Sequence, residues 1–499
     1  MRPDGTWPDV DYASRDAADF PALEHLRRAQ ALPPAERLTA LEAWRRLAPR
    51  SDNWWYNEIG APQVVGDALL DLDLSPTDRA SWGEWLAAAI GPVPKAGQNL
   101  VWVSAIHLRR GLITRDDAVV TEAVERMCSV LAFTDEEGVQ RDHSFHQHGP
   151  QLYSGGYGAS LVASLTRWLH LFPEPAVRFF TDFLLDGQQW FAHGSSYDFA
   201  AMGRELVRPD AHRLDSLREA VDRLSGSPYR AEEVAALAAR LDGDGPPLVG
   251  TKWFPRSDYL AHRRPTWAFA VRMSSTRTVP TETLNGENTL GRHLGDGVAT
   301  FRVGAADGYR EVLSRWDWAR LPGTTTEQGR SLLPRPYLER GAAEDVLGWA
   351  DGEHGVAVMR LAGVDRFTDG WKAWFCFPDA VVALGAGISA PGANRVITTV
   401  DQRLAVDEPT TGGPTAGAVR HGGLTYLPLS PHFASVENGI FTLGFDHGPG
   451  PVHASYACVV APDLPEVEVL ANTPAVQSVR CGGTTLTRRG RDVERAPRR

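Results

Sequence analysis

The stretch 242-DGDGPPLVG-250 divides the sequence into two parts of different periodicity. Its Gly, Pro and Asp residues are typical of a turn-rich linker. Before it, apolar residues recur at helical spacing, and after it short apolar segments alternate with turn residues. The sequence therefore predicts a helical domain at residues 1–245 and an antiparallel β-sheet domain at residues 250–499, an α+β multidomain chain.

The first part of the chain predicts mid-length helices joined by short loops. Several of them begin after Asp, Ser or Pro, as helix N-termini prefer. The expected helical segments are 21–47 (interrupted by Pro33-Pro34), 78–90, 100–113, 116–133, 159–172, 176–191, 215–224 and 231–241. This series favours an array of helical hairpins.

The second part of the chain predicts strands separated by turns, with no clear helix between them. The expected strands are 267–275, 297–304, 355–363, 380–388, 395–406 and 454–462. Short connections without helices favour antiparallel pairing, so we expect large stacked sheets.

Composition limits the classes of partner. The chain has 499 residues and a formal net charge of −11, which argues against a general nucleic-acid binder. Four scattered cysteines form no C-x-x-C pair, so neither a zinc site nor a disulfide framework is indicated. We see no signal peptide and no apolar run long enough to span a membrane. We therefore expect a cytoplasmic protein with no membrane partner.

The stretch 142-DHSFHQHGPQLYSGGYGAS-160 concentrates chemistry-bearing side chains. It holds three His and two Tyr on a glycine-rich turn that leads into a helix. Imidazole and phenol groups can transfer protons to and from an uncharged leaving group. A competing interpretation is a metal site, in which His143, His146 and His148 form H-x-x-H-x-H and Asp142 supplies a fourth ligand.

Three further segments combine unusual residues. In 51-SDNWWYNEIGAPQ-63, the adjacent Trp54 and Trp55 cannot both face one helical core, so we expect at least one to be available to a ligand. In 96-AGQNLVW-102, Asn99 stands at a helix start, where simple N-capping is the alternative. In 202-MGRELVR-208, Arg204 and Arg208 are four residues apart and would share a helix face, with a solvated charged face as the alternative.

These segments together resemble polysaccharide lyase family 8, the hyaluronate, chondroitin AC and xanthan lyases. The resemblance includes Asn53-Trp54-Trp55 through Gly60, Gly97 to Val101, the DHSFHQH…YSGGYG pair and the Arg-x-x-x-Arg motif. It continues through residues 282–291, 295–297, 320–325, 372–388 and 398–403, in the same order. Two departures stand out: His143 replaces a family glycine, and the final β part looks reduced.

The resemblance implies an N-terminal incomplete α/α toroid followed by an antiparallel β-sandwich (super-sandwich) domain, with a cleft between them. It also implies β-elimination on a uronic acid. In that reaction the enzyme removes the C5 proton and expels the 4-linked sugar oxygen, leaving a C4–C5 double bond. Family members are usually secreted.

The resemblance also implies roles for individual residues. Asn99, with His148 nearby, would neutralise the uronate carboxylate, and Tyr157 would protonate the leaving oxygen. Either Tyr157 or His148 would take the C5 proton. The implied catalytic residues are Asn99, His148, Tyr157, Arg204 and Glu282, and the implied substrate-binding residues are Asn53, Trp54, Trp55, Arg208, Asn285 and Glu287.

The predicted function is therefore a lyase of a uronic-acid-containing anionic polysaccharide resembling hyaluronate or chondroitin. We expect no metal, no cofactor, no nucleic-acid partner and a monomer. The alternatives are a lyase of xanthan- or gellan-type bacterial polysaccharides and a non-catalytic carbohydrate-binding protein on the same scaffold.

Overall fold

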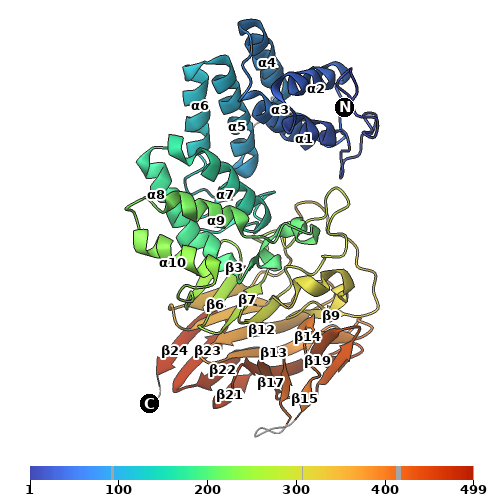
Figure 1. Cartoon of the computed structure of the whole chain (residues 1–499). Coiled ribbons are helices and arrows are strands. Elements are labelled where there is room, and N and C mark those ends of the chain that lie inside the picture. The colour runs from blue at the N-terminus through green and yellow to red at the C-terminus, as the bar shows by residue number, and fades with distance from the viewer. Residues whose placement is uncertain (92–94, 306, 412–416, 498–499) are drawn as a thin grey trace. The chain divides into compact units, whose positions relative to one another are not determined.

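The structure is a computed structural model that describes residues 1–91, 95–305, 307–411 and 417–497. Its chain divides into two compact units, residues 1–133 with 160–180 and residues 134–159 with 181–499. The first unit is helical, and the second holds the long strands together with two helices (Figure 1). The linker at 242–250 marks the predicted change from helix to strand, and its role as a domain boundary stays a prediction.

Each helical segment predicted from the sequence contains an observed helix. The helices are α1 (Leu23–Gln30), α2 (Pro34–Leu47), α3 (Ala61–Leu69), α4 (Pro76–Ala89), α5 (Gly97–Thr114), α6 (Asp117–Cys128), α7 (Gly156–Trp168), α8 (Glu174–Asp182), α9 (Asp215–Leu224) and α10 (Ala231–Asp242). Short π or 3-10 turns are η1 (Tyr56–Gly60), η2 (Leu169–Leu171), η3 (Phe183–Gly187), η4 (Gln188–Phe191), η5 (Phe199–Ala201), η6 (Gly203–Val207), η7 (Arg310–Arg315) and η8 (Trp318–Arg320). The sequence prediction omits α3.

Local chemistry fixes where several helices begin. Ser75 caps α4 by accepting a hydrogen bond from the Asp78 backbone N–H, and Pro76 occupies the first turn, where its missing N–H costs nothing. Asp116 caps α6 in the same way. The helices of the first unit then bury a shared core that includes Leu26, Trp82 and Ile106.

The second unit is built from antiparallel sheets. The strands are β1 (Gly138–Val139), β2 (Phe145–His146), β3 (Ala192–His193), β4 (Ser196–Tyr197), β5 (Gly250–Phe254), β6 (Tyr259–Arg263), β7 (Trp267–Arg272), β8 (Val298–Val303), β9 (Thr325–Glu327), β10 (Val346–Ala350), β11 (Gly355–Arg360), β12 (Asp369–Cys376), β13 (Val381–Ser389), β14 (Val396–Leu404), β15 (Thr410–Thr411), β16 (Val419–His421), β17 (Leu424–Pro428), β18 (Phe433–Glu437), β19 (Ile440–Gly448), β20 (Ala454–Ala461), β21 (Val467–Asn472), β22 (Val476–Cys481), β23 (Thr484–Arg489) and β24 (Asp492–Pro497). All six predicted strands are confirmed as β7, β8, β11, β13, β14 and β20.

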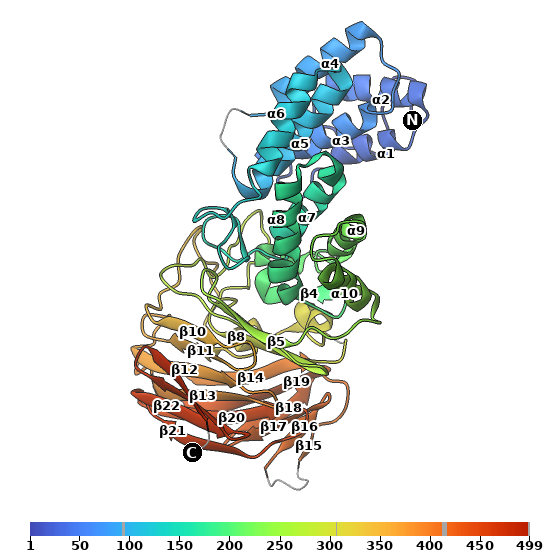
Figure 2. The same cartoon turned by 90° about the vertical axis from the view of Figure 1, so that its left-hand side faces the viewer.

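The strands form stacked layers (Figure 2). The largest sheet has the order β10-β11-β12-β13-β20-β17-β16-β15. Three four-stranded sheets accompany it, with the orders β5-β6-β7-β8, β18-β19-β14-β9 and β21-β22-β23-β24. The last of these occupies the C-terminal residues, where the sequence predicts only a reduced β part.

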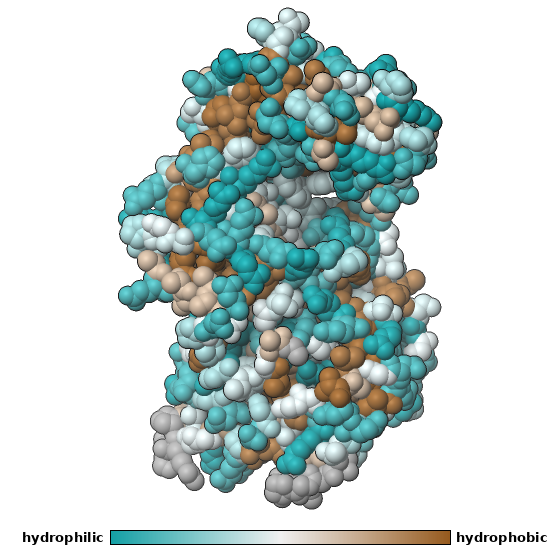
Figure 3. Space-filling model, viewed as in Figure 1, coloured by the Kyte–Doolittle hydropathy of each residue, from teal (hydrophilic) through white to brown (hydrophobic). Residues whose placement is uncertain are grey.

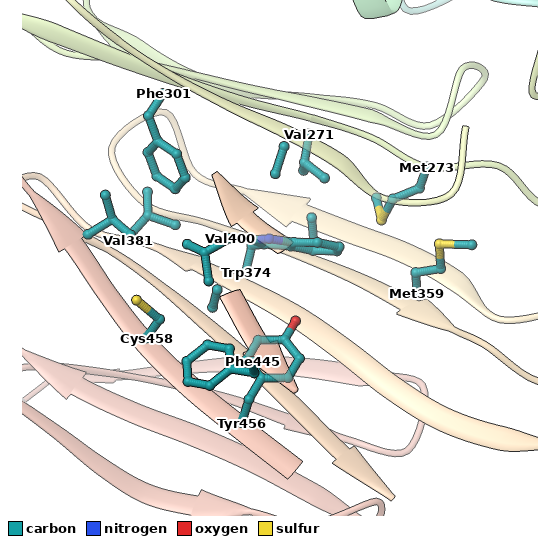
Figure 4. Close-up of a cluster of buried hydrophobic side chains, with 14 of the residues drawn as sticks. Val271, Met273, Phe301, Met359, Trp374, Val381, Val400, Phe445, Tyr456 and Cys458 are labelled. Atoms are coloured by element: carbon teal, nitrogen blue, oxygen red, sulfur yellow. The ribbon is translucent and has the colours of Figure 1, made fainter. Parts of the chain in front are cut away.

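The eight-stranded sheet buries both of its faces, as the alternation along β12 shows. Trp374 and Cys376 join one apolar core with residues of β5–β8, while Ala373 and Phe375 join a second core with residues of β22 and β23. Figure 4 shows Trp374 in the first core, between Val271 and Phe445. Burying a large apolar side chain contributes roughly 1.5–3 kcal/mol, so these two cores fix the stacking of the sheets.

Exposed large hydrophobic side chains are scattered over the chain, and the visible surface is mostly hydrophilic (Figure 3). Within the described ranges, no helix has the length and apolar character needed to cross a lipid bilayer.

Candidate active site

His148 lies in the loop between β2 and α7, in a left-handed backbone conformation with φ of 57°. Such a backbone in a non-glycine residue costs about 1–3 kcal/mol, so its surroundings must hold it in place. Glu137 does so from both sides of the residue. One of its carboxylate oxygens accepts a hydrogen bond from the Gly149 N–H at 2.9 Å, and the other accepts one from the Gln147 amide.

Glu282 is the hub of the site. Its side chain is 1% exposed and accepts hydrogen bonds from His148 Nδ1 at 2.8 Å, from the Tyr153 hydroxyl at 2.9 Å and from Arg204 Nη1. Burial by itself would raise the pKa of the Glu282 carboxyl, but its bonds and charge contacts with His148 and Arg204 lower it. Glu282 is therefore an ionised acceptor, and His148 Nδ1 carries the proton that it donates. The other ring nitrogen, Nε2, makes no hydrogen bond to any residue that the structure describes.

Arg204 connects this hub to a second carboxylate. The side chain is buried, and its Nε donates to Glu287 Oε2 at 2.9 Å. Arg208 forms a two-pronged pair with the same Glu287 at 2.6 and 2.9 Å, and it also lies 3.0 Å from Glu205. The arginines and glutamates that the sequence singled out thus form one ion-pair network. Glu205 belongs to it as well, although the sequence analysis did not select it.

Tyr157 packs beside this network at the start of α7. Its ring centroid lies 4.9 Å from that of His148 and 5.0 Å from that of Tyr153, and its side chain is almost fully buried. Burial raises the pKa of the Tyr157 phenol to about 12, against the lowering effect of the Arg204 charge and hydrogen bond. At neutral pH the hydroxyl is therefore protonated and available as a proton donor.

Two glycines make room for Tyr153, which aligns the hub. A Cβ atom added at Gly203, where φ is 55°, would lie 2.2 Å from the Tyr153 ring. A Cβ atom added at Gly156 would lie 2.4 Å from Glu205 and 2.9 Å from the Tyr153 ring. Only glycine allows the backbone to approach this closely, so both residues help to place the Tyr153 hydroxyl between Glu282 and the Arg204 backbone N–H.

Asn285 forms part of a tight turn whose backbone conformation requires positive φ. Asn285 and Gly286 both have positive φ, 53° and 78°, in a tight turn closed by the hydrogen bond from Glu287 N–H to Leu284 C=O. This Asn-Gly turn is the type that a two-residue hairpin prefers, and it presents Glu287 to the arginines. The neighbouring Asn288, which the sequence analysis did not select, donates to Thr281 Oγ1 and to the Glu282 carbonyl and so fixes the hub's backbone.

The tryptophan pair lies in the first compact unit. Trp54 is 42% exposed, whereas Trp55 is partly buried and packs edge-on against Trp102 at 5.4 Å. Trp54 is therefore the exposed indole of the pair, and its availability to a ligand stays a prediction. Lys95 Nζ lies 3.8 Å from the centre of the Trp54 ring and 3.0 Å from Glu58, which adds a cation that the sequence analysis did not select.

Asn53 and Asn99 differ in how their amides are used. The Asn53 amide donates to the Ala17 carbonyl and accepts from the Trp55 backbone N–H, so it shapes the turn that carries the tryptophans. Asn99, in the first turn of α5, is 9% exposed, and its Oδ1 has no hydrogen-bond partner among the residues described. The cap position of α5 is held by Ala96, so N-capping does not account for Asn99.

Two of the three histidines in the 142–160 stretch, His146 and His148, have different surroundings. His146 is fully buried, its Nε2 lies 2.9 Å from Ser257 Oγ, and burial lowers its pKa to about 3. His148 instead turns to Glu282. No group of three or more His, Cys, Asp or Glu suited to a metal ion occurs within the described part of the chain. Tyr337, half exposed, adds an aromatic ring 6.1 Å from that of His148.

Comparisons with known proteins agree with this architecture. Residues 38–224 match the model of the polysaccharide lyase family 8 N-terminal alpha-helical domain, and residues 249–425 match that of the family 8 super-sandwich domain. Chondroitinase-AC of Pedobacter heparinus is 27% identical over 96% of this chain and 79% of its own length. Hyaluronate lyase of Thermasporomyces composti is 28% identical over 86% of this chain and 68% of its own length.

Solved structures give the same result. A chondroitinase AC lyase structure superimposes with a TM-score of 0.89 at 26% identity, over 97% of this chain and 84% of that one. A Paenibacillus xanthan lyase structure, 20% identical, has the same fold with a TM-score of 0.77, over 97% of this chain and 60% of that one. The predicted fold class, an incomplete α/α toroid followed by a β-sandwich domain, is confirmed.

Proposed function

Because this chain belongs to polysaccharide lyase family 8, we propose that it cleaves a uronic-acid-containing anionic polysaccharide by β-elimination. The single observation that carries this proposal is the buried network of His148, Arg204 and Glu282 beside Tyr157. Hyaluronate- or chondroitin-like polymers are the proposed substrates, because relatives named chondroitinase-AC and hyaluronate lyase align over most of the chain.

The first requirement of the reaction is a weaker negative charge on the uronate carboxylate. The C5 proton is only weakly acidic beside a charged carboxylate, and elimination moves further charge onto the carboxylate oxygens. Hydrogen-bond donors aimed at those oxygens stabilise the transition state. We assign this role to the Asn99 amide, joined by His148 when Nε2 as well as Nδ1 carries a proton, because Nε2 of a neutral imidazole protonated on Nδ1 can only accept.

The second requirement is proton transfer. Tyr157, with a pKa of about 12, holds its proton at neutral pH and is the proposed donor to the leaving oxygen. The C5 proton goes either to Tyr157 in its phenolate form, which the Arg204 charge favours and which then passes that proton to the leaving oxygen, or to Nε2 of a neutral His148 while the Tyr157 hydroxyl protonates the leaving oxygen.

The third requirement is a surface that holds a chain of sugar rings. The exposed Trp54 offers an apolar face of the kind that sugar rings stack on, and Lys95 beside it adds a positive charge suited to an anionic polymer. Trp55 and Asn53 are proposed to support this platform. Arg208, Asn285 and Glu287 are proposed to support substrate binding near the network.

A panel of polymers tests the proposal. The protein is incubated with hyaluronate, chondroitin, chondroitin sulfate and xanthan, with neutral dextran as a control, and the ultraviolet absorbance of the unsaturated product is followed. We expect absorbance to grow with hyaluronate or chondroitin and not with dextran. Absence of the signal with every uronate polymer would contradict the proposal.

A further inference from the structure

A cavity in the second compact unit is lined by three arginines that form no ion pair with any of the described residues. The cavity has a volume of about 280 Å³ and is walled by the 242–250 linker, the ends of β6 and β7, and helices α9 and α10. Arg240, Arg263 and Arg264 all line it, together with His193. None of the proposed catalytic residues contributes to its wall.

Arg263 is the most unusual of the three. It is 3% exposed at the end of β6, and its Nε and Nη1 have no hydrogen-bond partner among the residues described. Its Nη2 donates a hydrogen bond to the Trp190 carbonyl at 2.5 Å. A buried charge without a partner is costly, so the position calls for a counter-charge.

The protein's own acids do not supply that charge. Buried Arg204 is paired with Glu282, and buried Arg302 is paired with Asp198. Across the described ranges, by contrast, no Asp or Glu lies within 4.0 Å of Arg240, Arg263 or Arg264. Asp198, the carboxylate whose charge Arg263 feels, is occupied by Arg302 and by the Tyr259 hydroxyl.

The neighbouring arginines point to the same conclusion. Within the described part of the chain, the Arg264 Nε is buried without a hydrogen-bond partner, and Arg240 donates hydrogen bonds to two neutral groups, the Gln189 side chain at 2.7 Å and the Pro246 carbonyl. The remaining wall is largely apolar and includes Leu217, Leu237 and Trp267. Guanidinium groups in an apolar wall are suited to two-pronged binding of a planar or tetrahedral oxyanion.

We propose that this cavity binds the oxyanion group of one small ligand, a carboxylate, sulfate or phosphate, through Arg240, Arg263 and Arg264. The volume suits a single small molecule rather than a polymer, because ligand pockets usually measure about 300–1,000 Å³. The ligand is either an inorganic oxyanion or a small sugar acid, and this site is separate from the proposed elimination site.

Titration calorimetry at fixed ionic strength tests the proposal with inorganic sulfate, inorganic phosphate, glucuronate and, as a neutral control, glucose. We expect binding of at least one oxyanion and none of glucose. Binding of sulfate or phosphate alone identifies an inorganic ligand, and preference for glucuronate identifies a sugar acid. No binding of any of the three oxyanions overturns the proposal.

Substitutions locate the binding. Arg264→Met is expected to weaken binding of the oxyanion at least tenfold with little risk to folding, since the buried Arg264 Nε makes no hydrogen bond to any described residue. Arg263→Met should do the same. Arg223→Met, on the exposed face of α9 and outside the cavity wall, should bind as the wild type does. Unchanged affinity in both cavity variants, or loss of binding in Arg208→Met of the elimination site, would refute the assignment.

Discussion

Replacing Tyr157 with Phe removes a single hydroxyl and tests the proposed proton transfer directly. A positioned acid or base contributes about 10²–10⁴-fold to a rate, which corresponds to roughly 3–5 kcal/mol of activation free energy. We expect kcat of Tyr157→Phe on the best uronate polymer to fall by that factor. The free energy of unfolding should fall by only about 1 kcal/mol, the usual value of one hydrogen bond, here the bond with Arg204.

Tyr153→Phe is the matched control, because it removes a hydroxyl from a tyrosine that is also buried and whose ring centroid lies 5.0 Å from that of Tyr157. The Tyr153 hydroxyl donates a hydrogen bond to Glu282 at 2.9 Å and accepts hydrogen bonds from the Arg204 backbone N–H at 3.1 Å and from Arg204 Nη1 at 3.4 Å. Losing these bonds leaves buried polar groups unpaired, so we expect about 2–4 kcal/mol less stability. The rate should fall by at most about tenfold, because no proton moves through Tyr153.

The assay combines the initial rate of product absorbance with urea unfolding of each variant. The expected pattern is opposite in the two variants: Tyr157→Phe loses rate and keeps stability, and Tyr153→Phe loses stability and keeps most of its rate. A Tyr157→Phe variant with near-normal kcat would refute the proton-donor role. Equal loss of rate in the two variants would show that the ring cluster as a whole, rather than the Tyr157 proton, determines activity.

Three further predictions follow from individual contacts. Because the pKa of Glu282 is lowered from 4.5, the stability that its ionised form contributes is complete above about pH 4.5 and is lost as pH falls through the lower folded value. Urea unfolding should therefore give Glu282→Gln a smaller free energy of unfolding than the wild type at pH 7. Below about pH 4.5, that free energy should also depend less on pH in the variant than in the wild type. Lys95→Met should raise KM for an anionic polymer severalfold at low salt with kcat unchanged, and the difference should shrink in about 0.5 M salt; the same rise at all salt concentrations would contradict an electrostatic role. Gly203→Ala should lower the free energy of unfolding by at least about 2 kcal/mol, whereas Gly226→Ala, with no atom within 4 Å of the added carbon, should be near neutral; equal effects would contradict the packing argument.

The sequence predicted best those helices and strands whose own residues show a clear hydrophobic period. Residues 215–224 form a helix with the predicted bounds, because its apolar residues fall on one face. α3 escaped prediction because Pro62 lies near its start and a π turn, η1, precedes it, which obscures the period. In the C-terminal sheet, the outer strand β21 is half to fully exposed and residues 492–496 of the other outer strand, β24, are mostly exposed and include Asp492, Glu494 and Arg495, so these strands lack the apolar runs that indicate buried strands.

The candidate site shows a similar limit. Sequence motifs selected Glu282 and Arg204, but these residues are 78 positions apart, and His148 is 134 positions from Glu282. Their pairing depends on chain topology, which local patterns do not encode. Lys95 and Glu205 were missed because each is a single charged residue in an ordinary setting. Asn285 was selected by motif, and its positive φ indicates that the Asn-Gly turn is what the motif requires there.

The pairing of Arg204 and Arg208 with glutamates affects how strongly this site could bind a substrate carboxylate before and during elimination. Arg204 is shared between Glu282 and Glu287, and Arg208 is paired with Glu287 and Glu205, so neither guanidinium is left to bind a substrate carboxylate strongly. A site with free arginines would stabilise the ground-state uronate as much as the transition state and gain little in rate. Uncharged donors, the role that we propose for the Asn99 amide, bind a carboxylate weakly until charge accumulates on its oxygens. Because the arginines are already paired, we expect the site to stabilise the charge that develops on the carboxylate oxygens in the transition state more than the charge of the ground-state carboxylate.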